Sequence, residues 1–246
     1  MYRALCTEFY NADKKFASAD EVHFYSAFFN KQSSLILEPM CGSGRLLIPL
    51  MQEGFNIHGI DNSIPMLNSC SERAAKLGLK PTLFEQSIES MELPHQYDVI
   101  LIPLGSYQLL YPRSVAYKAL QNFYQHLRPG GKLIVDLFVP WEALHENNEK
   151  EFSEREVVLP DGGTIKHKSH NVANKYEQYY YGESTYEKII NDKVIAREDE
   201  QMHVCWYYHY EMELILEKYK FKNIQYLEKN FMNENHMIFI AEKRLF

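Results

Sequence analysis

The sequence is poor in cysteine, and the spacing of its cysteines excludes several kinds of site. The four cysteines of the 246-residue chain stand far apart, at Cys6, Cys41, Cys70 and Cys205, and none forms a Cys-x-x-Cys pair. This excludes a zinc knuckle and a redox dithiol. No group of His, Asp and Glu has convincing metal-ligand spacing, so we expect no metal site. The first residues lack the apolar core of a signal peptide, which predicts a cytoplasmic protein with reduced cysteines.

Positive charge and long apolar runs are also scarce. The chain has 26 Lys and Arg residues against 33 Asp and Glu, and its net charge of -7 weighs against nucleic acid as a partner. No apolar run approaches the length of a membrane span, so we expect no membrane partner. The length fits one substantial α/β domain with an insertion.

The strongest motif lies within residues 35–46. The apolar run Leu35–Leu37 predicts a buried strand, Glu38 follows it, and a turn then holds Gly42 and Gly44 before a helix. A strand, a glycine turn and a helix make the nucleotide-binding geometry of open α/β sheets. A dinucleotide fingerprint needs a third glycine, which is absent here. An acid just before the turn also suits a cationic ligand better than a phosphate.

A second acid ends the next expected strand. Residues 55–60 read as a strand that leads into Asp61, and Ser63 and Pro65 then start a helix that runs to about Leu77. An acid at this point can accept hydrogen bonds from both hydroxyls of a ribose. Two acids at the ends of successive strands, with a glycine turn between them, are far more specific than either feature alone.

Together these residues resemble the class I S-adenosylmethionine (SAM) methyltransferases. Glu38 to Gly44 resembles motif I of that family, with Met40 where the first glycine usually stands, and residues 59–67 resemble its Gly-x-Asp-x-Ser-x-x-Met-Leu pattern. The fourth strand, 97–103, resembles motif IV. The Arg-Pro-Gly-Gly-Lys turn at 128–132 precedes the fifth strand as it does in the family. The resemblance covers roughly residues 35 to 140.

The resemblance implies a fold and a cofactor. The fold is α/β, a Rossmann-like seven-stranded mostly parallel sheet with helices on both faces and an inserted antiparallel β subdomain. The cofactor is SAM, and the product is S-adenosylhomocysteine (SAH). Related sequences bind the adenine amino group with an acid after the third strand, where this chain has Ser87, with Gln86 or Glu89 as alternative contacts. The predicted cofactor contacts are Tyr25, Glu38, Met40, Gly42, Gly44, Arg45, Asp61, Asn62, Met66, Ser87, Ile88 and Leu104.

Two further regions are expected to meet the acceptor. Residues 1–34 read as helical and are placed over the cleft, with Tyr10 and Tyr25 as residues of interest. Tyr10 and Tyr107 are candidate substrate contacts. His209, which precedes the last long helix, is a candidate general base near neutral pH.

Residues 150–208 differ in character from the rest. Alternating β-branched and polar residues, a hairpin signal at 161–163 and expected turns at Gly182 and 191–192 predict about four antiparallel strands. We expect a core of residues 1–149 and 209–246, with 150–208 as a lid on the acceptor side. Similar insertions occur in sugar N-methyltransferases and glycine N-methyltransferase. Aromatic side chains that would either line an acceptor pocket or pack on the core are Tyr179, Tyr180, Tyr181, Trp206, Tyr207 and Tyr208. Asp199, Glu200 and His203 are interpreted as a solvated face of a strand.

The leading hypothesis is a SAM-dependent methyltransferase that acts on a small molecule by in-line displacement, as a monomer or homodimer. An RNA or protein methyltransferase is one alternative, which the acidic charge disfavours. The Asn-Pro-Pro-Tyr type of sequence that marks methylation of base amino groups is also absent. A non-catalytic SAM-binding protein is the other alternative, motivated by Met40 and Ser87.

Overall fold

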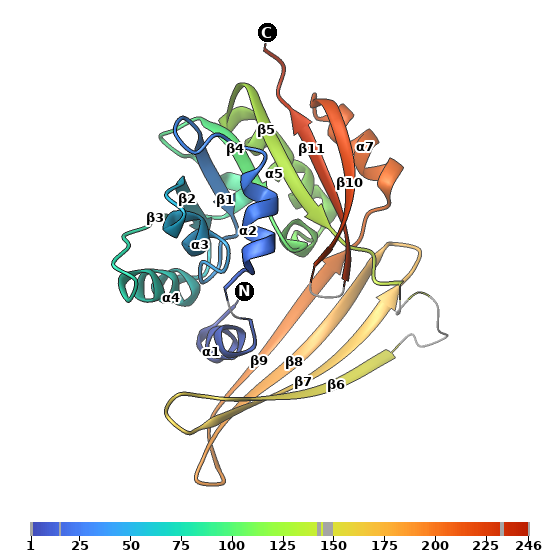
Figure 1. Cartoon of the computed structure of the whole chain (residues 1–246). Coiled ribbons are helices and arrows are strands. Elements are labelled where there is room, and N and C mark those ends of the chain that lie inside the picture. Colours follow the sequence, from blue (N-terminus) through green and yellow to red (C-terminus); the bar gives the residue numbers. More distant parts are fainter. Residues whose placement is uncertain (1, 15, 142–143, 145–149, 232–233, 246) are drawn as a thin grey trace.

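The chain folds into a seven-stranded sheet with a separate four-stranded sheet below it (Figure 1). This computed structural model describes residues 2–14, 16–141, 144, 150–231 and 234–245. The strands of the large sheet are β1 (Leu35–Pro39), β2 (Asn56–Asp61), β3 (Thr82–Glu85), β4 (Tyr97–Ile102), β5 (Leu127–Leu137), β10 (Lys222–Phe231) and β11 (Glu234–Glu242). Their order is β10-β11-β5-β4-β1-β2-β3, and β11 runs antiparallel to both of its neighbours. The predicted mostly parallel sheet is confirmed.

Helices cover both faces of this sheet, which explains why its central strands read as continuous apolar runs. On one face lie α5 (Arg113–His126) and α7 (His209–Lys218), packed through residues such as Phe123 and Leu216. On the other face lie α2 (Ala19–Ser26), α3 (Leu47–Gln52) and α4 (Ile64–Ala75). The Ser63 hydroxyl caps α4 by accepting from the Met66 N–H, and Pro65 stands in its first turn.

The insertion forms the second sheet, an antiparallel meander of β6 (Lys150–Val158), β7 (Thr164–Asn174), β8 (Tyr179–Ile190) and β9 (Lys193–Cys205). The expected turns at 161–163 and 191–192 are present. The expected turn at Gly182 is wrong, because Gly182 lies within β8. A Cβ there would stand 2.6 Å from the Asn171 side chain of the neighbouring strand, so this glycine permits close cross-strand packing instead. The predicted domain boundary at residue 149 lies outside the described residues.

The N-terminal region is two helices rather than one. α1 (Ala4–Asp13) is separate from α2, and it lies against the small sheet. The Glu198 carboxylate on β9 accepts the amides of Leu5 and Cys6 at 3.0 and 3.3 Å, and so satisfies free donors at the start of α1. Phe9 packs with Ile165 and Tyr186 in a small apolar cluster of its own. Within the described ranges, no helix has the length and apolar character needed to cross a membrane.

Candidate active site

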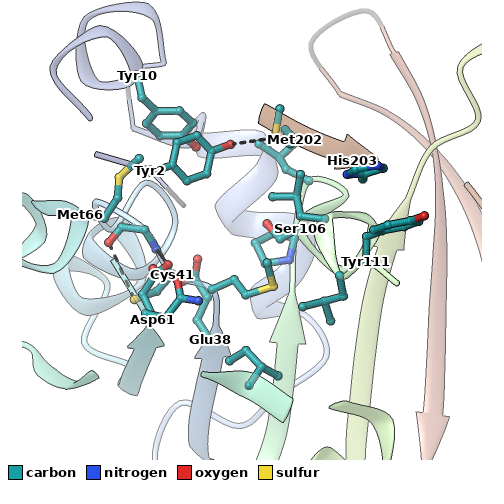
Figure 2. Close-up of a pocket in the computed structure, with 18 of the residues that line it drawn as sticks. Tyr2, Tyr10, Glu38, Cys41, Asp61, Met66, Ser106, Tyr111, Met202 and His203 are labelled. Atoms are coloured by element: carbon teal, nitrogen blue, oxygen red, sulfur yellow. Dashed lines mark hydrogen bonds between the residues drawn. The ribbon is translucent and has the colours of Figure 1, made fainter. Parts of the chain in front are cut away.

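A cavity of about 420 Å³ opens at the carboxyl ends of β1, β2 and β4. Its other walls come from Tyr2 and Tyr10 of the N-terminal region and from the end of β9. Figure 2 shows Asp61 and Met66 on one side of this cavity, His203 and Tyr111 on the opposite side, and Tyr2 and Tyr10 above. Ligands of open α/β sheets bind at this edge. The cavity is therefore the candidate active site.

The glycine turn forms although its first glycine is replaced. Met40 adopts a left-handed backbone with φ of 57°, and Gly42 and Gly44 have φ of 53° and 77°. The Cys41 N–H donates to the Ile60 carbonyl at 3.2 Å, which ties the turn to β2. Met40 thus takes the conformation that the usual glycine would take, at a steric cost that the surrounding turn must offset.

Asp61 links the turn to the start of α4. Its Oδ2 accepts the Gly42 N–H at 2.9 Å, and its Oδ1 accepts the Ser63 N–H at 2.8 Å. Burial raises the pKa of Asp61, and the amides of Ser63 and Gly42 oppose that rise. Each carboxylate oxygen has a further lone pair, so this side chain can still accept a bond from a ligand hydroxyl.

Glu38 is the most unusual group in the cavity. It is only 3% exposed, and its Oε2 has no hydrogen-bond partner in the described part of the chain. Burial raises the pKa of Glu38 to about 8, against a smaller lowering by Arg45. The Arg45 guanidinium is paired with Glu21, with one N–O distance of 2.9 Å. Glu38 is therefore a buried carboxyl with an oxygen left for a cationic ligand.

The structure brings most of the predicted cofactor residues together at this cavity. Those that line it, with the candidate catalytic residue Tyr10, are Glu38, Met40, Gly42, Arg45, Asp61, Asn62, Met66, Ile88 and Leu104. Gly44 lies just behind the wall, where a Cβ would meet the Cys70 sulfur at 2.6 Å. Its role is close packing of the turn on α4.

Ser87 does not line the cavity. It precedes the short helix η1 (Ile88–Ser90), and the next two residues, Ile88 and Glu89, are the ones that face the cavity. The Gln86 side chain is also occupied, because it donates to and accepts from the backbone of Glu92. The expectation that Ser87 takes the place of the adenine-binding acid is therefore not supported by its position, and Glu89 is better placed.

Tyr25 acts through another residue instead of lining the cavity. It is fully buried, and its hydroxyl donates to Asp136 Oδ2 at 2.6 Å. The same oxygen accepts the Leu104 N–H at 3.0 Å, and His236 contacts Asp136 Oδ1 at 2.6 Å. Leu104 has φ of 49°. This buried network holds the strained turn that follows β4 against the cavity.

Two predicted catalytic residues lie elsewhere. Tyr107, in the short helix η2 (Ser106–Leu109), points into the core with no exposed surface and donates to the Ala116 carbonyl at 3.1 Å. His209 begins α7, where its ring stacks on Tyr226 with centroids 3.7 Å apart. Neither lines the cavity. Both residues were predicted to lie at the site because of their neighbours in the sequence. The direction of each side chain depends instead on the face of the helix that carries it.

The cavity is also lined by residues that the sequence did not predict there. They are Tyr2, Ser106, Leu109, Tyr111, Gln201 and Met202, together with Glu200 and His203. The interpretation of Glu200 and His203 as a solvated face is wrong for these two residues, because β9 lies against η2. Gln108 fixes that contact by donating to the Cys205 carbonyl at 2.7 Å.

Trp206 and Tyr208 are also outside the cavity. Trp206 is 1% exposed, and Tyr208 is 41% exposed beside Trp141. Of the inserted tyrosines, Tyr179 and Tyr181 flank His203, with ring centroids 5.4 and 5.0 Å from it. The insertion thus contributes to the cavity through the end of β9, whereas the aromatic residues that follow this strand pack on the core or face solvent.

Comparisons with known proteins agree with this architecture. Residues 36–131 match the family model described as a methyltransferase domain. The ubiquinone biosynthesis O-methyltransferase of Rickettsia prowazekii (strain Madrid E) is 30% identical over 108 residues, which are 44% of this chain and 41% of that protein. The chain thus matches less than half the length of this relative.

Two solved structures resemble the whole chain. The sugar N-methyltransferase KedS8 from Streptoalloteichus sp. ATCC 53650 has a TM-score of 0.73 and 18% identity, over 96% of this chain and 91% of that one. CalS10, an amino pentose methyltransferase from Micromonospora echinaspora, has a TM-score of 0.69 and 16% identity, over 99% and 98%. Residues 36–131 therefore resemble a methyltransferase domain, and the chain has the Rossmann-like fold of these solved methyltransferases.

Proposed function

We propose that this protein is a SAM-dependent methyltransferase that transfers a methyl group to a small-molecule acceptor by in-line displacement. The observation that carries the proposal is Glu38, a buried carboxyl whose Oε2 has no partner among the described residues and which lines the cavity. Such a group is costly in an apolar site unless a ligand pairs with it. The ammonium group of the methionine part of SAM would be that partner.

The remaining lining residues fit the other parts of the cofactor. Asp61 stands at the end of β2, where its carboxylate can accept the ribose hydroxyls. Ile88 and Glu89 would flank the adenine, with Glu89 as a hydrogen-bond acceptor. Leu104 follows β4 and would lie beside the methyl group. Met40 adopts the left-handed backbone that the usual glycine would take, which supports an intact turn over a degenerate, non-catalytic site.

When bound, SAM supplies an electrophilic methyl group on a sulfonium. The task of the protein is to align the acceptor with that group and to exclude water. Tyr2, Tyr10 and Met202 close the cavity from above, and the Tyr2 hydroxyl lies 4.0 Å from the Met202 sulfur (Figure 2). The Asp136 network fixes the Leu104 turn, so that wall of the cavity is rigid.

A small acceptor is supported by the enclosure of the site and by its relatives. α1 connects the two sheets: Asn11 donates to the Ser69 hydroxyl at 2.7 Å on α4, and Glu198 of β9 holds its first turn. The similar proteins are named as an O-methyltransferase of ubiquinone biosynthesis, a sugar N-methyltransferase and an amino pentose methyltransferase. We accordingly assign residues 150–208 to the acceptor side and the remaining chain, with its cofactor motifs, to SAM.

Calorimetric titration tests the cofactor assignment. We expect SAH to bind and NAD not to bind, and Glu38→Gln to weaken SAH binding because an amide cannot pair with the ammonium charge. Binding of NAD without SAH would contradict the proposal. A metabolite screen with methyl-labelled SAM, read by mass spectrometry, then identifies the acceptor. Label transferred only to RNA or protein would contradict a small-molecule acceptor.

A further inference from the structure

One histidine faces the cavity from the acceptor side. His203 stands near the end of β9 and lines the same cavity as Leu104 and Ser106. Its ring stacks on Tyr111, with centroids 3.9 Å apart and planes 4° apart. Tyr179 and Tyr181 of β8 flank it on the other sides. The imidazole is thus oriented by aromatic packing.

His203 also lies on the side of the cavity that the proposed function assigns to the acceptor. Glu38 and Asp61, the proposed cofactor contacts, occupy the opposite side of the cavity in Figure 2. The turn with Leu104 and Ser106, which leads into η2, lines the same cavity. The bond from Gln108 to the Cys205 carbonyl ties η2 to the end of β9, so His203 has a fixed place relative to that turn.

The surroundings favour a neutral imidazole. The titratable groups that face or adjoin His203 are Tyr111, Tyr179, Tyr181 and, on its own strand, Glu200. Burial lowers the pKa of His203 below its ordinary value. A histidine in this state can accept a proton near neutral pH.

The cavity is acidic. Asp61, Glu89 and Glu200 line it, the raised pKa of Glu38 leaves that carboxyl protonated at neutral pH, and the Arg45 guanidinium is neutralised by Glu21. The rings of Tyr2 and Tyr10 also line the cavity, and aromatic rings attract cations. An anionic acceptor would be repelled here, whereas an ammonium group would be attracted. An amine is therefore the acceptor class that this charge distribution favours.

We propose that His203 is the catalytic base, which takes a proton from the ammonium form of an amine acceptor. This inference rests on the proposed function of the cavity. Loss of the proton to the imidazole Nδ1 or Nε2 gives a neutral amine and an imidazolium. The nitrogen lone pair then forms the new N–C bond to the methyl carbon. The electrons of the breaking C–S bond pass to sulfur, which leaves neutral SAH and a methylated ammonium, and His203 returns its proton to water.

A pair of cofactor analogues tests this before any acceptor is known. Sinefungin carries an amino-substituted carbon in place of the methylated sulfonium, so its ammonium group lies where methyl and acceptor meet. SAH lacks that group and otherwise makes the same contacts. The ratio of the two affinities therefore isolates interactions at the transfer position, because the effects of Glu38 and Asp61 on the two ligands cancel.

Calorimetry between pH 5.5 and 8 should show a defined dependence on His203. In the wild type, the preference for sinefungin over SAH should be highest at pH 8 and fall as the pH drops through the His203 pKa, since an imidazolium repels the ammonium. His203→Leu should lower the preference at pH 8 by roughly tenfold or more and remove its pH dependence. His203→Gln, which can accept a bond but does not titrate, should keep part of the preference without the pH dependence.

His95→Gln is the matched control, because His95 is an exposed histidine outside the cavity. It should behave as the wild type. If SAH and sinefungin both bind and their ratio does not depend on His203 or on pH, the inference is wrong and the cofactor assignment stands. If neither ligand binds, the proposed function itself fails and the inference fails with it.

Discussion

The two sides of the cavity are built in different ways. The side proposed for the cofactor comes mainly from one stretch, Glu38 to Met66, whose lining residues stand at the ends of β1 and β2, in the turns that follow them and at the start of α4. The side proposed for the acceptor comes from three separated segments: the N-terminal region, residues 106–111, and the end of β9. A ligand shared by a family can be bound by a local motif. A ligand particular to one protein is contacted by surfaces that only tertiary packing brings together.

The largest expected effect is on the cofactor side. Asp61→Ala removes the proposed ribose acceptor and leaves the amides of Gly42 and Ser63 without their carboxylate. We expect the affinity for SAH to fall by roughly 2–4 kcal/mol, measured by calorimetry on the folded variant.

Asp98→Ala is the matched control for this experiment. Asp98 also accepts a backbone amide, that of Leu35 at 2.7 Å, and pairs with Arg128, yet it lies outside the cavity. This variant should lose stability and keep its SAH affinity. Equal losses of affinity in both variants would mean that Asp61 acts only through folding.

A change on the acceptor side should separate turnover from cofactor binding. Tyr111→Ala removes the ring on which His203 stacks. With the acceptor found by the labelling screen, we expect kcat/KM to fall by roughly tenfold or more, because the base and the acceptor lose their alignment. The SAH affinity should change little.

Tyr208→Ala provides the comparison, since Tyr208 follows the same strand but faces solvent outside the cavity. Its turnover should match that of the wild type. If Tyr208→Ala were the more damaging change, the acceptor would bind beyond the end of β9, and the division of the cavity drawn above would be wrong.

Glu38 should lower the stability of the ligand-free protein at high pH, although it favours binding of the ligand. Its folded pKa of about 8 lies above the ordinary value of 4.5, so the folded protein binds more protons than the unfolded chain between these values. Stability contributed by this group is therefore lost as the pH rises toward 8. Glu38→Gln should raise the Tm of the ligand-free protein at pH 8.5 by roughly 3 °C or more, and the gain should shrink toward pH 4.5.

Binding of SAH should reverse this preference. The ammonium group favours the Glu38 carboxylate, so the wild type should release a proton on binding at pH 7. Calorimetry in buffers of different ionisation enthalpy measures that proton. A Glu38→Gln variant that released the same number of protons would show that another group pairs with the ligand.

The smallest effects are expected for Tyr107 and His209, the two predicted catalytic residues that lie outside the cavity. Tyr107→Phe loses one buried hydrogen bond to Ala116, which should cost about 1 kcal/mol in the free energy of unfolding. SAH affinity and the pH profile of transfer should not change. His209→Ala should likewise leave the pH profile intact. A shifted profile in either variant would place these side chains in the reaction after all.

Features made by residues close together in the sequence could be predicted, whereas contacts between distant segments of the chain could not. The large sheet was predictable because apolar strands and capped helices alternate along the chain, and Glu38 and Asp61 each follow a strand directly. The buried position of Tyr107 was not predictable, since only the packing of η2 on α5 decides which way its ring points. Gly182 was predicted to form a turn from its local sequence. A glycine is required there because the Asn171 side chain on the neighbouring strand leaves no room for a Cβ.

The role of β9 lay beyond sequence reasoning for a similar reason. Alternation along a strand predicts two faces, and it does not say which neighbour covers each face. His203 faces the cavity because β9 is held against η2 through the Gln108 contact with Cys205, about a hundred residues away in the chain. The sequence shows that His203 is followed by several tyrosines. It does not show that Tyr111, on a distant segment of the chain, stacks on the His203 ring.

The crystal structure of the protein with SAH would test the division of the cavity most directly. We expect the ammonium group of SAH within hydrogen-bond distance of Glu38, its ribose hydroxyls on Asp61, and its sulfur pointing to open space beside His203. SAH bound with its sulfur turned away from β9, or bound outside this cavity, would contradict the account.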